Sequence, residues 1–159
     1  METNQVMYTI DTSSIIHGWH EAYPKDAFPA LWQKIEELID DGKLIAIEEV
    51  ILELEKKEDV LHKWAIKQEK LCVPIDIDIQ KEVREILKSH KRLLDTRKNR
   101  SGADPFVIAL AKVRKCTVIT NEKKTSSQEK PHIPDVCEKL GIRCINLLEL
   151  ILEQGWIFR

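Results

Sequence analysis

The stretch Val6–Asp11 (VMYTID) is a short apolar run that ends in an acid, and Thr12-Ser13-Ser14 follows it. This pattern is typical of a buried strand that leads into a loop or a helix cap. A carboxylate directly after a buried strand is costly unless something uses it. We therefore interpret Asp11 in two ways, as the cap of a following helix or as a side chain that points over a sheet edge toward a ligand.

The apolar runs that follow alternate between strand and helix character. Runs at 43–47, 116–120 and 142–145 predict strands, whereas 71–75 contains Pro74 and fits either a strand or an extended link. Helical spacing is found at 28–39, in two short helices within 48–66, and at 78–90, 104–113, 134–140 and 146–153. This order predicts an α/β fold, a three-layer α/β/α sandwich with a mainly parallel central sheet.

Composition limits the kind of protein. The 159 residues include 25 Lys and Arg and 27 Asp and Glu, which gives a net charge of −2. A chain of this length predicts one domain over residues 1–159. The charge balance excludes a polycation that coats nucleic acid, so any contact with nucleic acid must be local. The polar N-terminus and the lack of a run of about 18 apolar residues predict a cytoplasmic protein without a membrane span.

Several other kinds of site fit the sequence poorly. A phosphatase of the haloacid dehalogenase type needs a second aspartate two residues after the first, where Ser13 stands. A dinucleotide-binding fold needs a glycine-rich first loop, which 12–14 does not supply. The cysteines have no C-x-x-C spacing, which favours buried reduced thiols over disulfides or zinc; they are Cys72, Cys116, Cys137 and Cys144.

Two further acids stand where a carboxylate can serve a ligand. Glu53 lies in the helical run 50–54, beside the buried stripe of that helix, although it is one of several acids there. Asp104 precedes Pro105 and a nearly apolar helix, which makes it an expected N-cap as well as a candidate ligand. Each residue therefore has a structural and a functional interpretation.

The fourth acid has two candidates. Glu122 follows the strand 116–120 together with Thr120 and Asn121, and a hydroxyl beside an acid can fix the carboxylate or bind a metal-bound water. Asp135, at the start of the helix 134–140, is the alternative. We favour Glu122 and keep Asp135 as a further candidate metal ligand.

The acids imply a metal if the strands are parallel, because the carboxyl ends of parallel strands share one edge of the sheet. Carboxylates that meet there repel one another unless divalent cations neutralise them. Hard oxygen ligands favour Mg²⁺ or Mn²⁺ over zinc, and such ions can activate water and steady the leaving oxygen of a phosphodiester. The pattern predicts metal-assisted hydrolysis of nucleic acid.

A basic segment leads into Asp104. Between residues 88 and 100 the chain carries six Lys and Arg residues against one acid. A run of charged residues is commonly just a solvated face. Because this run lies close to a predicted acidic site, phosphate binding is an equally supported interpretation. The predicted RNA-binding residues are Lys91, Arg92, Arg97, Lys98 and Arg100, with Lys123 and Lys124 on the opposite side of the site.

The tryptophans are candidates for contact with nucleic acid, because aromatic side chains can stack on unpaired bases. Trp32 and Trp64 fall on the apolar faces of helical segments and are predicted to lie in the core. Trp19 comes soon after Asp11 and is a candidate for substrate contact, with packing inside the protein as the alternative.

In order and spacing, Asp11, Glu53, Asp104 and Glu122 resemble the acids of the PIN domain, the fold of Mg²⁺-dependent ribonucleases that includes the VapC-type toxins of toxin–antitoxin pairs. The match to the DUF4411 subgroup of PIN-like proteins is closer. It rests on YTIDTS at 8–13, EVILEL at 49–54, ADPF at 103–106 and IPDVC at 133–137. The resemblance spans nearly the whole chain.

This resemblance implies a PIN-like fold, an acidic pocket for Mg²⁺ or Mn²⁺, and endonucleolytic cleavage of RNA. Thr12, Ser13 and Thr120 would support the carboxylates or metal-bound water. A cognate antitoxin is the implied partner, and the fold is compatible with a homodimer. One departure is that the last acid, usually an aspartate, is Glu122 beside Asn121. The alternative function is a PIN-like module that binds RNA or protein without cleaving.

Overall fold

The computed structural model describes residues 6–90, 102–125 and 131–158. In these residues five parallel strands form one sheet in the order β3-β2-β1-β4-β5. They are β1 (Tyr8–Ile10), β2 (Leu44–Ile47), β3 (Cys72–Val73), β4 (Thr117–Ile119) and β5 (Cys144–Ile145). The strands are short and largely buried, as expected of a sheet covered on both faces. The predicted parallel sheet is confirmed.

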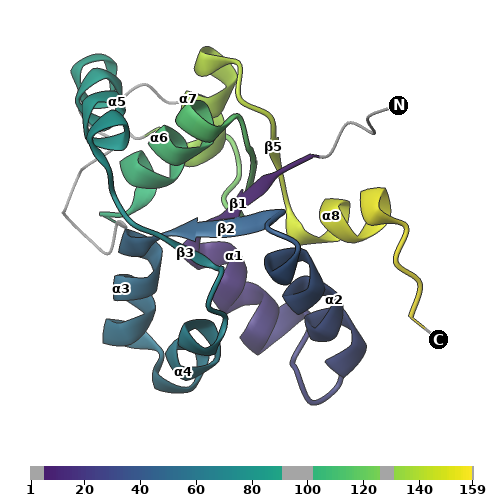
Figure 1. Cartoon of the computed structure of the whole chain (residues 1–159). Helices are drawn as coiled ribbons and strands as arrows, with labels where there is room; N and C mark the ends of the chain where they lie inside the picture. Colours follow the sequence, from purple (N-terminus) through teal and green to yellow (C-terminus); the bar gives the residue numbers. More distant parts are fainter. Residues whose placement is uncertain (1–5, 91–101, 126–130, 159) are drawn as a thin grey trace.

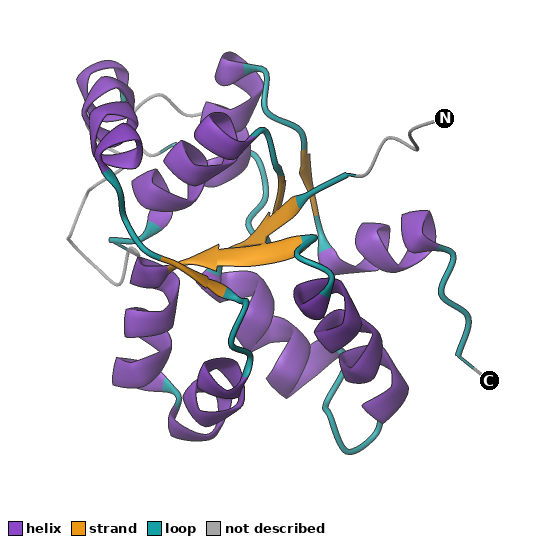
Figure 2. Cartoon of the chain, viewed as in Figure 1, coloured by secondary structure: helices purple, strands orange, loops and turns teal. Residues whose placement is uncertain are grey.

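Helices cover both faces of the sheet (Figure 1, Figure 2). One face carries α1 (Thr12–His17), the π-helix η1 (Gly18–Ala22), α2 (Pro29–Asp40), α3 (Glu48–Lys57) and α4 (Asp59–Lys67). The other face carries α5 (Ile77–Ser89), α6 (Asp104–Arg114) and α7 (Ile133–Leu140), and α8 (Leu147–Gln154) follows β5. The three-layer α/β/α arrangement predicted from the sequence is therefore confirmed.

The order of the strands reverses between β1 and β4. The chain first moves outward from β1 to β2 and β3, then returns through α5 and α6 to pair β4 with the free side of β1. In the register of this pair, Tyr8 lies opposite Thr117 and Ile10 opposite Ile119. Open parallel sheets bind ligands at such a reversal, beyond the carboxyl ends of the strands. The residues that follow β1 and β4 therefore lie at the expected position of a site.

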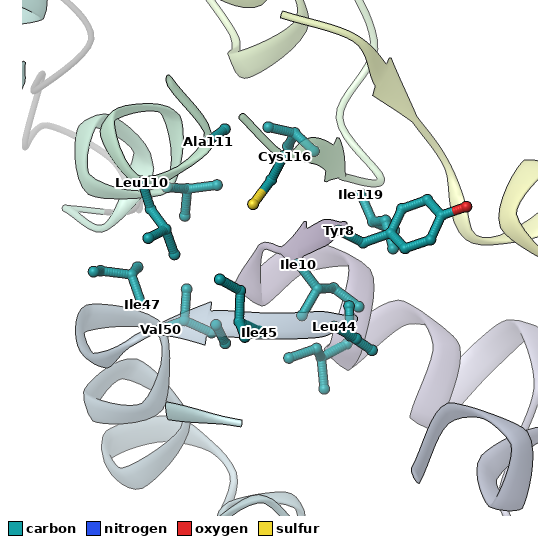
Figure 3. Packing of buried hydrophobic residues seen from close by; sticks show 14 of the residues in the cluster. Tyr8, Ile10, Leu44, Ile45, Ile47, Val50, Leu110, Ala111, Cys116 and Ile119 are labelled. Carbon is teal, nitrogen blue, oxygen red and sulfur yellow. The ribbon is translucent and has the colours of Figure 1, made fainter. Parts of the chain in front are cut away.

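Helix α6 forms the centre of one layer. Its residues Val107, Ile108 and Leu110 are fully buried, and the helix contacts β1, β2 and β4. Figure 3 shows Leu110 and its neighbours from α6 facing side chains of the sheet such as Ile45. A helix that is apolar almost all round is typical of a position between layers. The predicted helix 104–113 is thus confirmed at nearly its predicted length.

The segment after Asp11 differs most from the sequence interpretation, which left 12–27 without a defined helix. The structure places α1 and η1 there, and Asp11 caps α1. Residues 12–27 lack the long apolar repeat that indicates a helix. Contacts with distant parts of the chain stabilise this segment instead. For example, Gly18 lies so close to Leu147 that an added Cβ would approach the leucine Cδ2 to 2.8 Å.

Three tryptophans pack together between α4, α2 and η1. The ring centroids of Trp19 and Trp32 are 5.0 Å apart, and those of Trp32 and Trp64 are 5.4 Å apart. The core positions predicted for Trp32 and Trp64 are confirmed. For Trp19 the structure shows packing inside the protein, because its ring contacts those of Trp32 and Trp64.

Two expectations from composition can be compared with the structure. All four cysteines are free thiols, as expected, and Cys116 and Cys137 are buried whereas Cys72 is exposed. Among the described residues, no helix combines the length and the apolar character that crossing a membrane requires.

Replacing Ile108 with alanine tests the central role of α6. We expect Ile108→Ala to lower the free energy of unfolding by about 2–5 kcal/mol, because it opens a cavity at a fully buried position. The matched control is Ile66→Ala on α4, where the side chain is 57% exposed and the change should stay within about 0.5 kcal/mol. Urea unfolding measures both, and equal losses would contradict the assigned core.

Candidate functional site

Asp11 lies at the carboxyl end of β1, directly beside β4. Its backbone N–H donates to the carbonyl oxygen of Ile119 at 3.0 Å, which continues the β1–β4 pairing. Its side chain is only 2% exposed, and Oδ1 accepts from the N–H of Ser14 at 2.9 Å to cap α1. Asp11 therefore caps the helix and also stands at the edge of the sheet, so the two interpretations hold together.

Hydroxyl groups surround the Asp11 carboxylate. The Ser13 hydroxyl lies within donating distance of both carboxylate oxygens, at 3.0 and 2.9 Å. The Thr120 hydroxyl, from the end of β4, donates to Oδ2 at 2.5 Å. These contacts fix the orientation of the carboxylate, and the role of Ser13 and Thr120 in supporting a metal site stays a prediction.

The pKa of Asp11 is raised from 3.8 to about 7. Burial is the main cause, because the charged form loses its water, and the negative charge of Glu122 adds to it. The hydrogen bonds from Thr120, Ser14 and Ser13 act in the opposite direction but do not offset burial. A cation near this carboxylate would therefore be strongly favoured.

Glu122 approaches Asp11 from the segment after β4. Its N–H donates to the Thr120 hydroxyl at 3.1 Å, and its Oε1 accepts from the N–H of Ile133 at 3.0 Å, at the start of α7. The N–H of Asn121 donates to the Ser13 hydroxyl at 3.3 Å. The strand end and the first turn of α1 are thus tied together, with Glu122 near enough to influence Asp11.

Glu53 reaches the same region from α3. The Thr12 hydroxyl lies 3.4 Å from its Oε1, and Lys57 Nζ lies 3.6 Å from its Oε2. The side chain is only 15% exposed, since Val50 and Leu54 on the same helix are fully buried beside it. The position beside the buried stripe, predicted from spacing, is confirmed.

Asp104 is the first residue of α6 and is 3% exposed. The predicted N-cap role at this residue is wrong by one position, because Ala103 is the N-cap and Pro105 is the second helical residue. The shift occurs because proline fits either of the first two helical positions, where its missing N–H costs nothing. Figure 1 shows α6 beginning on the side of the molecule where β1 and β2 end.

Asp135 has a structural role in loop closure. Its carboxylate accepts from the backbone N–H and the hydroxyl of Thr125 and from the N–H of His132, at 2.8–3.1 Å. With His132 it forms the capping box of α7. These bonds give Asp135 a structural role at the start of α7. Glu122, whose charge acts on the pKa of Asp11, is therefore the fourth acid of the metal site proposed below.

Of the predicted RNA-binding residues, the structure describes Lys123 and Lys124. Lys91, Arg92, Arg97, Lys98 and Arg100 lie outside the described residues. Lys124 forms an ion pair with Glu138 of α7, which raises the pKa of the lysine. The carbonyl oxygen of Lys123 lies 2.9 Å from the His132 ring, within the same loop. The RNA-binding role of these residues therefore stays a prediction.

The donor chemistry of the site fits a hard divalent cation. Carboxylate oxygens are the ligands that Mg²⁺ and Mn²⁺ prefer, and the Asp11 carboxylate is buried and poorly neutralised. Within the described ranges, no group of three or more acidic, histidine or cysteine side chains already forms a metal cage. Binding would therefore require the acidic side chains to move closer together.

Three contacts of the site were not predicted from the sequence. Lys57 follows Glu53 by four residues, a spacing that brings side chains together on a helix and could have revealed the pair. The N–H of Ser14 could have been found from the capping pattern three residues after an aspartate. The hydrogen bond from the N–H of Asn121 to the Ser13 hydroxyl joins segments that are far apart in the sequence, so no local pattern predicts it.

Solved structures share the fold at low sequence identity. The crystal structure of FitAcB from Neisseria gonorrhoeae has 18% identity and a TM-score of 0.54, covering 88% of this chain and 97% of that chain. DNA-bound VapBC from Salmonella typhimurium has 14% identity and a TM-score of 0.53, with coverages of 89% and 98%. VapBC2 from Rickettsia felis, bound to a promoter DNA fragment, has 12% identity and a TM-score of 0.53, with coverages of 89% and 98%.

The family is shown by the sequence itself. No curated protein matches the chain significantly. Residues 8–158, however, match the model of the family described as a domain of unknown function, DUF4411. This match covers nearly the whole chain and includes all of the acids discussed above. The chain therefore belongs to the DUF4411 family, and its fold is the PIN-like fold expected from the order of those acids.

Proposed function

We propose that this protein is a Mg²⁺- or Mn²⁺-dependent endoribonuclease that hydrolyses RNA phosphodiester bonds. The observation that supports this most is the buried Asp11 carboxylate at the reversal of the sheet, with Glu122 beside it and a raised pKa. Burial disfavours the charged form of such a group at neutral pH, because that form is desolvated. Its presence is accounted for if a cation neutralises it during function.

The proposed metal ligands are Asp11, Glu53, Asp104 and Glu122. The bound ion would activate water and stabilise the leaving oxygen. Neighbouring residues would hold these ligands in place. Ser13 and Thr120 orient Asp11, and Thr12 orients Glu53 through the contact at 3.4 Å. The start of α6 holds Asp104 out of water.

We further propose that the nuclease is the toxin of a toxin–antitoxin pair. The resemblance to VapC-type toxins and the likeness of fold to the VapBC structures support this role. The proposed partner is an antitoxin protein that blocks the acidic site, and a homodimer is compatible with the fold. We place the protein in the cytoplasm on the basis of its sequence.

A non-cleaving binding module is the second candidate function. It is favoured by the lack of a ready-made metal cage among the described residues. The two functions differ in one measurement, since only the nuclease cuts RNA when Mg²⁺ or Mn²⁺ is supplied and stops when EDTA is added. Metal binding and RNA binding without cutting would support the module.

Replacing Asp11 with asparagine tests the proposed site. We expect Asp11→Asn to keep the fold, because the amide oxygen can still cap α1, and to lower the rate of RNA cleavage by about 100-fold or more. The assay is cleavage of a mixed single-stranded RNA with Mn²⁺ and with EDTA. Asp41→Asn, at the exposed end of α2, is the matched control and should cut like the wild type. Wild-type rates in Asp11→Asn would sink the assignment.

The raised pKa of Asp11 predicts how stability depends on pH in the absence of metal. Between its ordinary value of 3.8 and about 7, the folded protein keeps a proton that the unfolded chain releases. Stability from this group is therefore present at low pH and is lost as the pH rises through about 7. Because asparagine does not ionise, Asp11→Asn should become more stable than the wild type between about pH 5 and pH 8.

Urea unfolding in EDTA over that pH range measures this difference. Addition of Mn²⁺ at about pH 8 should then stabilise the wild type and leave Asp11→Asn nearly unchanged, since a ligand stabilises only the state that binds it. A stability difference that does not change with pH would show that Asp11 is ionised normally.

A further inference from the structure

A lysine lies at the rim of the acidic site. Lys57 follows Glu53 by one turn of α3, and its Nζ lies 3.6 Å from Glu53 Oε2. The Lys57 side chain is 53% exposed, whereas the Glu53 side chain is 15% exposed. The Glu53 carboxylate therefore lies against the protein, while the Lys57 side chain is open to the solvent.

The same glutamate connects Lys57 to the centre of the site. The other oxygen of Glu53 lies 3.4 Å from the hydroxyl of Thr12, which follows Asp11 directly. The positive charge of Lys57 is thus separated from the Asp11 region only by the Glu53 side chain. In that region the negative charge of Glu122 acts on the buried carboxylate of Asp11. Lysine is suited to phosphate contact here, because its flexible stem carries a compact charge with three donors.

We propose that Lys57 is a substrate-binding residue of this site and that its pairing with Glu53 keeps it in place before the metal and RNA arrive. When a metal binds Glu53, the ammonium group is released and contacts a phosphate oxygen of the RNA. The proposal rests on the proposed nuclease function. It goes beyond it because none of the four acids supplies a positive charge for the substrate.

This arrangement makes Lys57 and the metal competitors for one carboxylate. A partly exposed ion pair is weak, so a divalent ion displaces it readily. Removing the lysine charge should therefore tighten metal binding while weakening RNA binding. A lysine that only stabilised α3 would change neither quantity, and the opposite signs of the two effects identify the role.

The first experiment needs no RNA. Mn²⁺ is titrated into the wild type and into Lys57→Gln, followed by calorimetry. We expect Lys57→Gln to bind Mn²⁺ about two- to fivefold more tightly, as loss of a weak competing ion pair implies. The matched control is Lys34→Gln, which removes an exposed lysine that pairs with Glu37 at the same 3.6 Å on α2. Unchanged or weaker Mn²⁺ binding by Lys57→Gln would overturn the competition.

The second experiment measures the substrate contact. With Mn²⁺ present, Lys57→Gln should raise the KM for single-stranded RNA about tenfold and reduce the slope of log affinity against log salt by about 0.7, the value for one phosphate contact. Lys57→Arg keeps the charge and should recover most of the affinity, and Lys34→Gln should resemble the wild type. A wild-type KM and salt slope in Lys57→Gln would overturn the contact.

The two experiments separate failure of this proposal from failure of the proposed function. If the wild type cuts no RNA, anisotropy of a labelled RNA with Mn²⁺ replaces the rate measurement, and the same comparison of variants applies. Tighter Mn²⁺ binding with weaker RNA binding would then support Lys57 in a protein that binds without cleaving. If the wild type cuts RNA and Lys57→Gln matches it in both measurements, only the role of Lys57 is rejected.

Discussion

The burial of one carboxylate between β1 and β4 constrains the rest of the structure. Asp11 is almost fully withdrawn from water, and a group of this kind must receive hydrogen bonds from the protein. Its donors are the first turn of α1 and the hydroxyl of Thr120 at the end of β4. The start of α1, the pairing of β1 with β4 and the segment leading to Glu122 are therefore arranged around a single side chain.

Much of the fold could be predicted because its signals are local. The nearly apolar α6 and the strands β1, β2 and β4 are recognisable from short runs whose burial determines their composition. The π-helix η1 could not be predicted with the same ease, since Gly18 and Trp19 pack against the distant side chains of Leu147 and Trp32. Local patterns predict the main helices and strands, whereas packing between distant residues determines the segment that follows β1.

The candidate site shows the same division. Asp11 and Glu53 could be selected from the position of each acid relative to an apolar run. Glu122 could be favoured over Asp135 because it follows a strand beside Thr120, but the sequence left both open, and both contact the start of α7. The difference between them appears only when the loop is folded, with Asp135 holding Thr125 and His132 while Glu122 lies near Asp11. Which of the two acids acts on Asp11 is thus decided by the folding of the loop before α7.

The contact between Thr120 and Asp11 joins residues 109 positions apart, and it has a consequence for synthesis of the chain. The central strand is made first but gains β4 as a neighbour only after most of the chain has been made. Contacts of such long range form late and slowly during folding. A growing chain therefore carries Asp11 long before Thr120 and Glu122, so a nascent protein on the ribosome holds no assembled acidic centre until the chain has emerged beyond Glu122.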